Sequence, residues 1–323
     1  MARSKVLSAF LAGMITETDT KDILLFRGHR RRKVKVLLRG GLGNQLFQIQ
    51  LGLELTSLGR EVLFDDTFLR PGWHHKSRPL RSTNYAKTFG LPVTSSSPIS
   101  TWILKRLFLG IAYYLATKLR SGKIAFGPLL SSHNAVNVAE ANGKFLVDVP
   151  GMSNPLDPKA LEAVRRLLLQ KLADSPLESQ KSFIGVHVRR GDYVDLEEIY
   201  GRICIHYFQK SLKVCKSLTR TESISKVVLF TDSPEMVDSK ALMKDSDHKL
   251  YFASELKLEV LDEFRQLVGA AAIIGSNSSF SWWAAALSSA VVIMPTPFEG
   301  PNLMLPQYVM NANWERVSKC KQC

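Results

Sequence analysis

Short aliphatic runs alternate with amphipathic segments through the second half of the chain, and this alternation restricts the fold more than any other feature of the sequence. The runs have the length and composition of buried strands, and the segments between several of them have helical periodicity. Strands that alternate with helices are typical of a parallel sheet covered on both faces, so we expect a doubly wound α/β domain. The runs are 183–188, 226–230, 249–253, 271–275 and 291–295.

The first half opens with the same kind of unit. The strand-like run 34–38 leads directly into the glycine-rich turn 39–44, then an apolar helical segment, then a second strand at 61–66. A chain of 323 residues exceeds the usual size of one domain, and a polar, Ser- and Pro-containing stretch at 173–182 suits a linker. We therefore predict a basic extension over 1–33, a first lobe over 34–175 and a second lobe over 176–323.

The net charge of +14 points to anionic partners, and much of the excess lies in the run RGHRRRKVK at 27–35. The apolar stretch 101–120 is interrupted by Lys105 and Arg106, so it is predicted to be a buried or surface-docked helix and not a membrane span. Cys204 and Cys215 are too far apart along one predicted helix to bridge, and Cys320 and Cys323 form a single C-x-x-C. We expect four free thiols in a reducing compartment.

Polar residues follow each predicted strand, where parallel α/β sheets bind ligands. Arg189 and Arg190 end the run 183–188, and two rigid guanidinium forks at this place can hold a diphosphate and neutralise its charge as it leaves. Asp192 can anchor an arginine, and His187 shares the strand face of Arg189 and can donate to a phosphate. The alternative is a solvated surface pair with a structural histidine.

Three other strand ends carry weaker signals. The turn GGLGNQ, with Gly41, Gly43 and Asn44, lets a ligand approach the backbone, or is a tight strand–helix turn. Asp232 in FTDS can accept from a guanine amino group or a ribose hydroxyl, or form an Asx turn. The stretch SNSSFSWW offers hydroxyls and backbone N–H groups to an anion, or simply caps a helix. The D-x-D triplet at 245–247 precedes a predicted strand and does not follow one, so we expect no metal at the diphosphate, and the arginines would have to carry the leaving-group charge.

Taken together, these motifs resemble the α-1,2-fucosyltransferases of glycosyltransferase family 11. The stretches that carry the resemblance are GGLGNQLFQ (40–48), HVRRGDY (187–193), FTDS (230–233) and SNSSFSWWAAAL (276–287). The resemblance implies two Rossmann-like lobes of GT-B type with GDP-β-L-fucose bound in the cleft. It also implies metal-independent, inverting transfer to the 2-hydroxyl of a terminal galactose on a glycan, without a cofactor.

The same resemblance assigns roles to individual residues. It makes Asn44, Arg189 and Arg190 catalytic, with Asn44 orienting the acceptor hydroxyl or the fucose. Asp65, Asp66 and His187 are all left as candidate bases. The residues expected to contact the donor are Gly41, Gly43, His187, Asp192, Asp232, Ser278, Ser279 and Ser281.

Alternative functions stay open at this point. They are a fucosyltransferase of another linkage (α-1,6 or protein O-linked), a non-catalytic binder of nucleotide sugars, and a basic nucleic-acid-binding protein that uses 27–35. Animal members of the family carry a membrane anchor, and none is evident here. We therefore expect a cytoplasmic or peripherally membrane-associated protein and not a Golgi membrane protein, with 101–120 and the basic N-terminus as candidate membrane contacts.

Overall fold

The computed structural model describes residues 33–70, 83–95, 124–126, 129–131, 145–147, 158–172, 182–193, 197, 203–218, 224–296 and 313–319. The chain forms two compact units that divide in sequence between Lys171 and Leu172, with residues 77–79 assigned to the second unit. The predicted lobe boundary at 175–176 and the extension before Lys33 lie outside the described residues, so those bounds stay predictions.

The second unit is built on six parallel strands in the order β12-β11-β10-β7-β8-β9. Counted from β7, this is the order 3-2-1-4-5-6 of a doubly wound nucleotide-binding sheet, and the predicted α/β domain is confirmed. The strand order reverses between the neighbours β7 and β10, the point at which such sheets bind ligands. The strands are β7 (Phe183–Val188), β8 (Lys226–Thr231), β9 (Lys249–Phe252), β10 (Ala272–Ile274), β11 (Val291–Thr296) and β12 (Glu315–Ser318).

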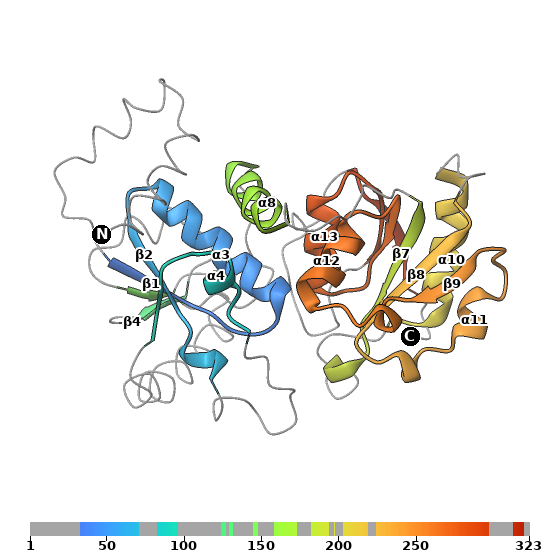
Figure 1. Ribbon diagram of the computed structural model, residues 1–323, viewed down its shortest axis with the longest axis horizontal. Coiled ribbons are helices and arrows are strands. Elements are labelled where there is room, and N and C mark those ends of the chain that lie inside the picture. Colours follow the sequence, from blue (N-terminus) through green and yellow to red (C-terminus); the bar gives the residue numbers. More distant parts are fainter. Residues whose placement is uncertain are drawn as a thin grey trace. The chain divides into compact units, whose positions relative to one another are not determined.

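Helices cover both faces of this sheet, as Figure 1 shows. Alternate residues of β7 point to opposite faces. Val186 packs with Phe208 of α10 (Ile205–Leu218) in one core, which also includes Leu242 of α11 (Ser239–Met243). Gly185 lies on the opposite face, where an added Cβ would be 2.6 Å from Leu267 of α12 (Val260–Val268). Helix α13 (Ser279–Leu287) packs beside α12 on that second face.

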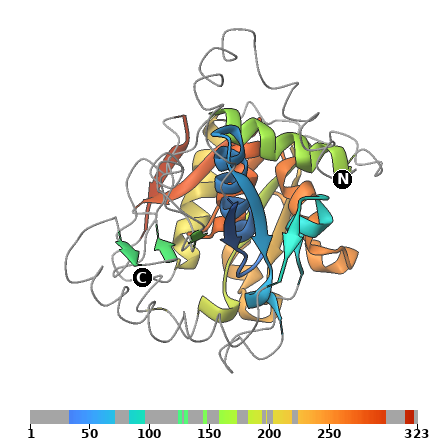
Figure 2. The same ribbon diagram turned by 90° about the vertical axis from the view of Figure 1, so that its left-hand side faces the viewer.

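The first unit is also a six-stranded sheet, in the order β3-β2-β1-β6-β5-β4, in which only β4 and β5 pair antiparallel. Its helices are α3 (Leu42–Ser57), η1 (Thr67–Leu69), α4 (Tyr85–Thr88) and α8 (Pro158–Leu172). In Figure 2, helix α3 lies along strands β1 and β2. The prediction of two α/β lobes is therefore confirmed. The strands are β1 (Lys33–Leu37), β2 (Glu61–Asp65), β3 (Val93–Thr94), β4 (Ile124–Phe126), β5 (Leu129–Ser131) and β6 (Phe145–Val147).

Among the described residues, no helix is long and apolar enough to cross a membrane. The segment 101–120 and the basic N-terminus, predicted as membrane contacts, lie outside the described residues.

The prediction of four free thiols is wrong for Cys204, which is disulfide-bonded. Cys215 is not disulfide-bonded and is buried in α10. The partner of Cys204 lies outside the described residues. Spacing along the sequence gave no sign that Cys204 is paired.

We expect peptide mapping under non-reducing conditions to recover the Cys204 peptide joined to a second cysteine-containing peptide. Cys215 should react with an alkylating agent only after unfolding, because its side chain is fully buried. Loss of the disulfide is expected to cost about 2–4 kcal/mol of stability. Recovery of alkylated Cys204 from the folded, unreduced protein would contradict the assignment.

Candidate functional site

One carboxylate holds Arg189 and Arg190, the two adjacent arginines that follow β7. Val188 and Thr231 are paired in register at the ends of β7 and β8, so Arg189 and Asp232 follow side by side. Nη1 of Arg189 lies 2.7 Å from Oδ2 of Asp232. The backbone N–H of Arg190 donates to Oδ1 of the same carboxylate at 3.0 Å. Both oxygens of Asp232 therefore fix the arginine loop at the carboxyl edge of the sheet.

The rest of this loop is fitted closely around that contact. A Cβ on Gly191 would lie 2.2 Å from Oδ2 of Asp232, so only glycine fits here without displacing the carboxylate. The hydroxyl of Tyr193 donates to the backbone carbonyl of Asn277 at 3.1 Å, which ties the loop to the connection between β10 and α13. The Arg189 guanidinium lies 5.4 Å from the centre of the Tyr193 ring, within cation–π range. Tyr193 was not predicted, although it belongs to the HVRRGDY stretch.

These contacts bear on two predicted residues. Asp192 was expected to anchor an arginine; its side chain is outside the described part of the chain, so this role stays a prediction. Asp232 anchors Arg189 in the structure. Asp232 was expected near a guanosine, and the contacts observed are those of a positioning residue; the guanosine contact stays a prediction.

His187 bridges the point where the strand order reverses. Its Nδ1 lies 2.9 Å from the hydroxyl of Ser276, which follows β10, and its ring stacks on Phe280 with centroids 5.2 Å apart. Burial, aided by the positive charge of Arg189, lowers the pKa of His187 to about 3. The imidazole is therefore neutral above that pH and is a weak base. The contact of His187 with Ser276 links the end of β7 to the residues that follow β10. The predicted hydrogen bond from His187 to a phosphate stays a prediction.

The titration of His187 should make stability depend on pH. In the unfolded chain the pKa is near 6.5, so between pH 6.5 and 3 the unfolded state binds more protons than the folded state. The free energy of unfolding is expected to fall as the pH falls below 6.5, by about 2 kcal/mol from this residue at pH 5. The free energy of unfolding, measured by urea titration at several pH values, should lack this pH-dependent component in the His187→Asn variant. His248→Asn, which also removes a histidine bonded to a serine, should keep it.

The serine-rich stretch divides into structural and accessible hydroxyls. Ser278 is the N-cap of α13, where its hydroxyl accepts from the N–H of Phe280. Ser281 is fully buried and donates to the carbonyls of Ser276 and Ser278, so its hydroxyl supports the turn. Ser279 is partly exposed at the first position of the helix. Of the three serines predicted to contact a donor, Ser279 is therefore the most accessible.

Glu263 is an acidic neighbour of this site that the sequence analysis missed. It lies in the first turn of α12. Burial and the negative charge of Asp232 raise the pKa of its carboxyl. The sequence showed only an amphipathic helix here, and nothing in the pattern indicated that its first turn lies near the end of β8.

The glycine turn belongs to the first unit, and helix α3 begins inside it, at Leu42. Gly40 has a φ of +76°, and a Cβ there would lie 2.6 Å from Nδ2 of Asn44. Asn44 thus packs over the glycine, with Gly41 as the N-cap and Gly43 buried in the first turn. The amide of Gln45 donates to the carbonyls of Gly40 and Thr83, both at 2.9 Å. Asn44 and the arginine loop lie in different units, and each is described by itself.

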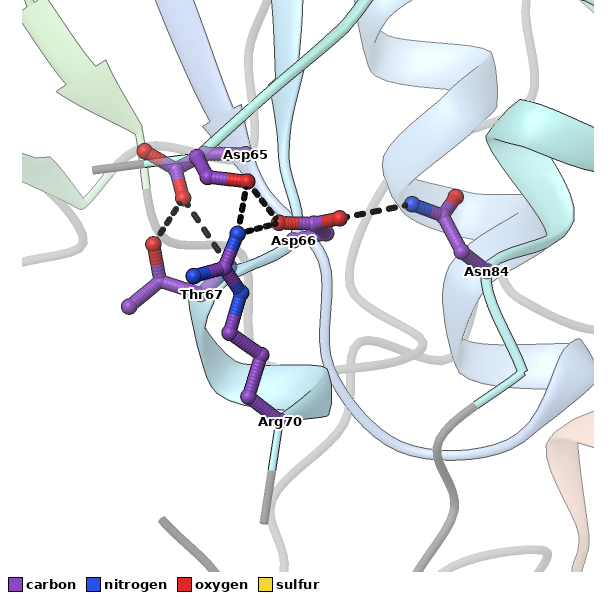
Figure 3. Close-up of polar contacts among 6 residues, drawn as sticks. Asp65, Asp66, Thr67, Arg70 and Asn84 are labelled. Atoms are coloured by element: carbon purple, nitrogen blue, oxygen red, sulfur yellow. Dashed lines mark hydrogen bonds and ion pairs between the residues drawn. The ribbon is translucent and has the colours of Figure 1, made fainter. Parts of the chain in front are cut away.

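Two adjacent aspartates lie at the end of β2 and differ sharply in their surroundings (Figure 3). Asp65 is fully buried and accepts from the backbone N–H of Thr67 at 3.0 Å and from its hydroxyl at 2.5 Å. The side chain of Asp66 is 24% exposed and contacts Arg70, Asn84 and Ser95. Of the three candidate bases, the Asp65 carboxylate is already hydrogen-bonded to Thr67. The imidazole of His187 is neutral and weakly basic. Asp66 is the accessible carboxylate.

Within the described ranges, no group of three or more His, Cys, Asp or Glu residues is arranged to hold a metal ion. The expectation that the chain works without a metal therefore stays a prediction.

Comparison with known proteins finds a family match that includes the arginine loop. Residues 159–316 match the sequence pattern described as Glycosyl transferase family 11, and this range contains Arg189, Arg190 and Asp232. The family 11 segment does not include the glycine turn at 40–48, whose assignment rests on its resemblance alone. No curated protein sequence matches the chain significantly.

Distant likenesses to solved glycosyltransferases accompany the family 11 match. Fucosyltransferase NodZ from Bradyrhizobium is 16% identical, with a TM-score of 0.46 over 80% of this chain and 94% of that chain. A variant of Arabidopsis thaliana FUT1 in complex with GDP is 12% identical, with a TM-score of 0.45 over 91% of this chain and 78% of that chain. At such distances, neither substrate nor linkage can be transferred to this chain.

Proposed function

We propose that this chain is an inverting fucosyltransferase that moves L-fucose from GDP-β-L-fucose to the 2-hydroxyl of a terminal galactose on a glycan. The observation that supports it most is the arginine loop, in which Asp232 fixes Arg189 and Arg190 where the strand order of the sheet reverses. The match of residues 159–316 to family 11 agrees with a glycosyl transfer. The 2-hydroxyl and the galactose come from the resemblance of the four motifs.

In the proposed reaction, the acceptor oxygen attacks C1 of fucose as the bond from C1 to the GDP oxygen breaks. Attack from the opposite face converts the β-linked donor to an α-linked product. The electron pair of the broken bond stays on the departing diphosphate, whose growing negative charge the guanidinium groups stabilise. The proton of the acceptor hydroxyl leaves to a base or to water.

The test is a measurement of GDP release from GDP-fucose with lactose, N-acetyllactosamine and a galactose-β-1,3-linked acceptor, with the linkage read by NMR of the product. Turnover with an α-1,2-linked product is the expected result. An α-1,6-linked product, or turnover only on a protein acceptor, would show that the linkage or acceptor differs from the proposed one. GDP-fucose would remain the donor.

Absence of GDP-fucose binding would overturn the proposal. In that case, steeply salt-dependent affinity for nucleic acid would favour the alternative of a nucleic-acid-binding protein. Residues 27–32, most of the basic run on which that alternative depends, lie outside the described residues.

The proposed reaction uses guanidinium groups in place of a metal to neutralise the diphosphate. We therefore expect full activity in excess EDTA, measured as GDP release after dialysis against the chelator. Activity that falls on dialysis and returns with Mg²⁺ or Mn²⁺ would show that a metal takes part.

A further inference from the structure

A polar cluster lies at the carboxyl edge of the first unit's sheet, where β2 and β3 both end. It consists of Asp66, Arg70, Asn84 and Ser95. Figure 3 shows the side chains of Arg70 and Asn84 directed toward the Asp66 carboxylate. Oδ1 of Asp66 accepts from the hydroxyl of Ser95 at 2.7 Å and lies 3.5 Å from Nη2 of Arg70. Oδ2 accepts from Nδ2 of Asn84 at 3.3 Å, and Arg70 also donates to Ser95. We propose that this cluster binds neighbouring hydroxyls of the acceptor sugar; this rests on the proposed function.

The cluster has capacity left for a ligand. A carboxylate offers about four lone-pair sites and a guanidinium five N–H donors. Among the described residues, the contacts of Asp66 occupy three acceptor positions, and the contact with Arg70 is long at 3.5 Å. The guanidinium of Arg70 uses only Nη2 in its contacts with these residues. The side chains of Asp66 and Arg70 are 24% and 46% exposed, so an approaching hydroxyl can reach both. Asp65, by contrast, is fully buried and already bonded to Thr67.

The charge of the cluster selects the class of ligand. One carboxylate and one guanidinium cancel, and the amide and hydroxyl are neutral. An anionic diphosphate would face the Asp66 carboxylate, which disfavours it here. A neutral sugar presents neighbouring hydroxyls that both donate and accept, which matches a carboxylate beside a guanidinium. The cluster therefore suits an uncharged sugar, whereas the loop at Arg189 and Arg190 suits a phosphate.

The cluster is held in place by the glycine turn of the same unit. The side-chain oxygen of Gln45 accepts from the N–H of Tyr85 at 3.0 Å, and its amide group donates to the carbonyls of Gly40 and Thr83. Asn84 lies between Thr83 and Tyr85 and caps α4. The same short segment therefore contacts both the turn that carries Asn44 and the Asp66 carboxylate. Such a network keeps the cluster rigid before a ligand arrives.

The decisive variant is Asp66→Asn, which preserves shape and removes the charge. We expect the KM for N-acetyllactosamine to rise roughly 10- to 100-fold, because a hydrogen bond to a charged group is lost. The KM for GDP-fucose should stay within about twofold. The matched control is Glu162→Gln, since Glu162 pairs with Arg166 four residues on at 3.2 Å, as Asp66 pairs with Arg70. It should leave both constants unchanged.

Ser95→Ala is a second variant, in case Asp66→Asn does not fold. It removes one hydrogen-bond partner of Asp66 and leaves the carboxylate in place. A smaller rise in the same KM at unchanged melting temperature would support the proposal. An unchanged acceptor KM in Asp66→Asn would overturn it. So would equal changes in both KM values with a lowered melting temperature, since that marks a purely structural role.

Failure of the proposed function can be told apart by direct binding. If the wild-type chain does not use GDP-fucose, saturation-transfer NMR with N-acetyllactosamine tests the cluster alone. If the wild type binds N-acetyllactosamine and Asp66→Asn does not, the sugar site is supported and only the proposal of GDP-fucose as donor is rejected. No binding to the wild type would overturn both.

Discussion

Replacement of Arg190 by lysine is expected to lower kcat/KM for GDP-fucose by about 10²–10³-fold. Lysine keeps the positive charge and loses the rigid fork that binds two phosphate oxygens at once. Arg190 is only 8% exposed, so a misplaced ammonium group has little room to compensate. Initial rates of GDP release at varied GDP-fucose, with acceptor saturating, give the number.

The matched control for this change is Arg265→Lys in the same unit. The Arg265 side chain is also 8% exposed, and it pairs with Asp262 at 2.7 Å. It should retain nearly full activity. Near-normal turnover by the Arg190 variant would refute the diphosphate-binding role. Equal losses in the two variants, with equally lowered melting temperatures, would point instead to a general effect of replacing buried arginine.

Gly191→Ala is expected to lower kcat/KM by about 10²-fold, mainly through a higher KM for GDP-fucose. The new Cβ would lie 2.2 Å from Oδ2 and 2.9 Å from Cγ of Asp232, so the carboxylate must move. Arg189 then loses its ion pair and the Arg190 N–H loses its acceptor. Displacement of binding groups by about 1 Å is enough for a loss of this size.

Gly269→Ala is the control, because its added Cβ would have no neighbour closer than 3.5 Å. The combination of Gly191→Ala with Asp232→Asn tests the mechanism further. If the alanine acts by displacing the carboxylate, the two losses should be clearly less than additive. Additive losses would mean that Gly191 matters for another reason.

The strands of the second sheet could be predicted well because their pattern is simple. The runs that form β7, β8, β10 and β11 are continuous and apolar, as strands buried on both faces must be. The polar residues after them then fall at one edge by topology. Thus Arg189, Asp232 and Ser276 were all expected at the carboxyl ends before any coordinates were known.

The contacts among those residues could not be predicted in the same way. Sequence gives the edge to which a residue belongs, but not which oxygen meets which N–H. Asp192 and Asp232 are chemically equivalent candidates for an arginine partner. Placement of Asp232 there depends on the register of β7 with β8. His187 was expected to face a ligand, and its burial depends on Phe280 of α13, from the other side of the strand reversal.

The strand order of the second sheet has a consequence for how its arginine loop is assembled. β7, β8 and β9 are consecutive in sequence and neighbours in the sheet, so they can pair without the strands that come later. The ion pair of Arg189 with Asp232 needs only β7 and β8. The bond from Tyr193 to the carbonyl of Asn277 also needs β10 to join the other edge of β7. The loop is therefore fixed in two stages during folding, and the second stage waits for the second half of the sheet.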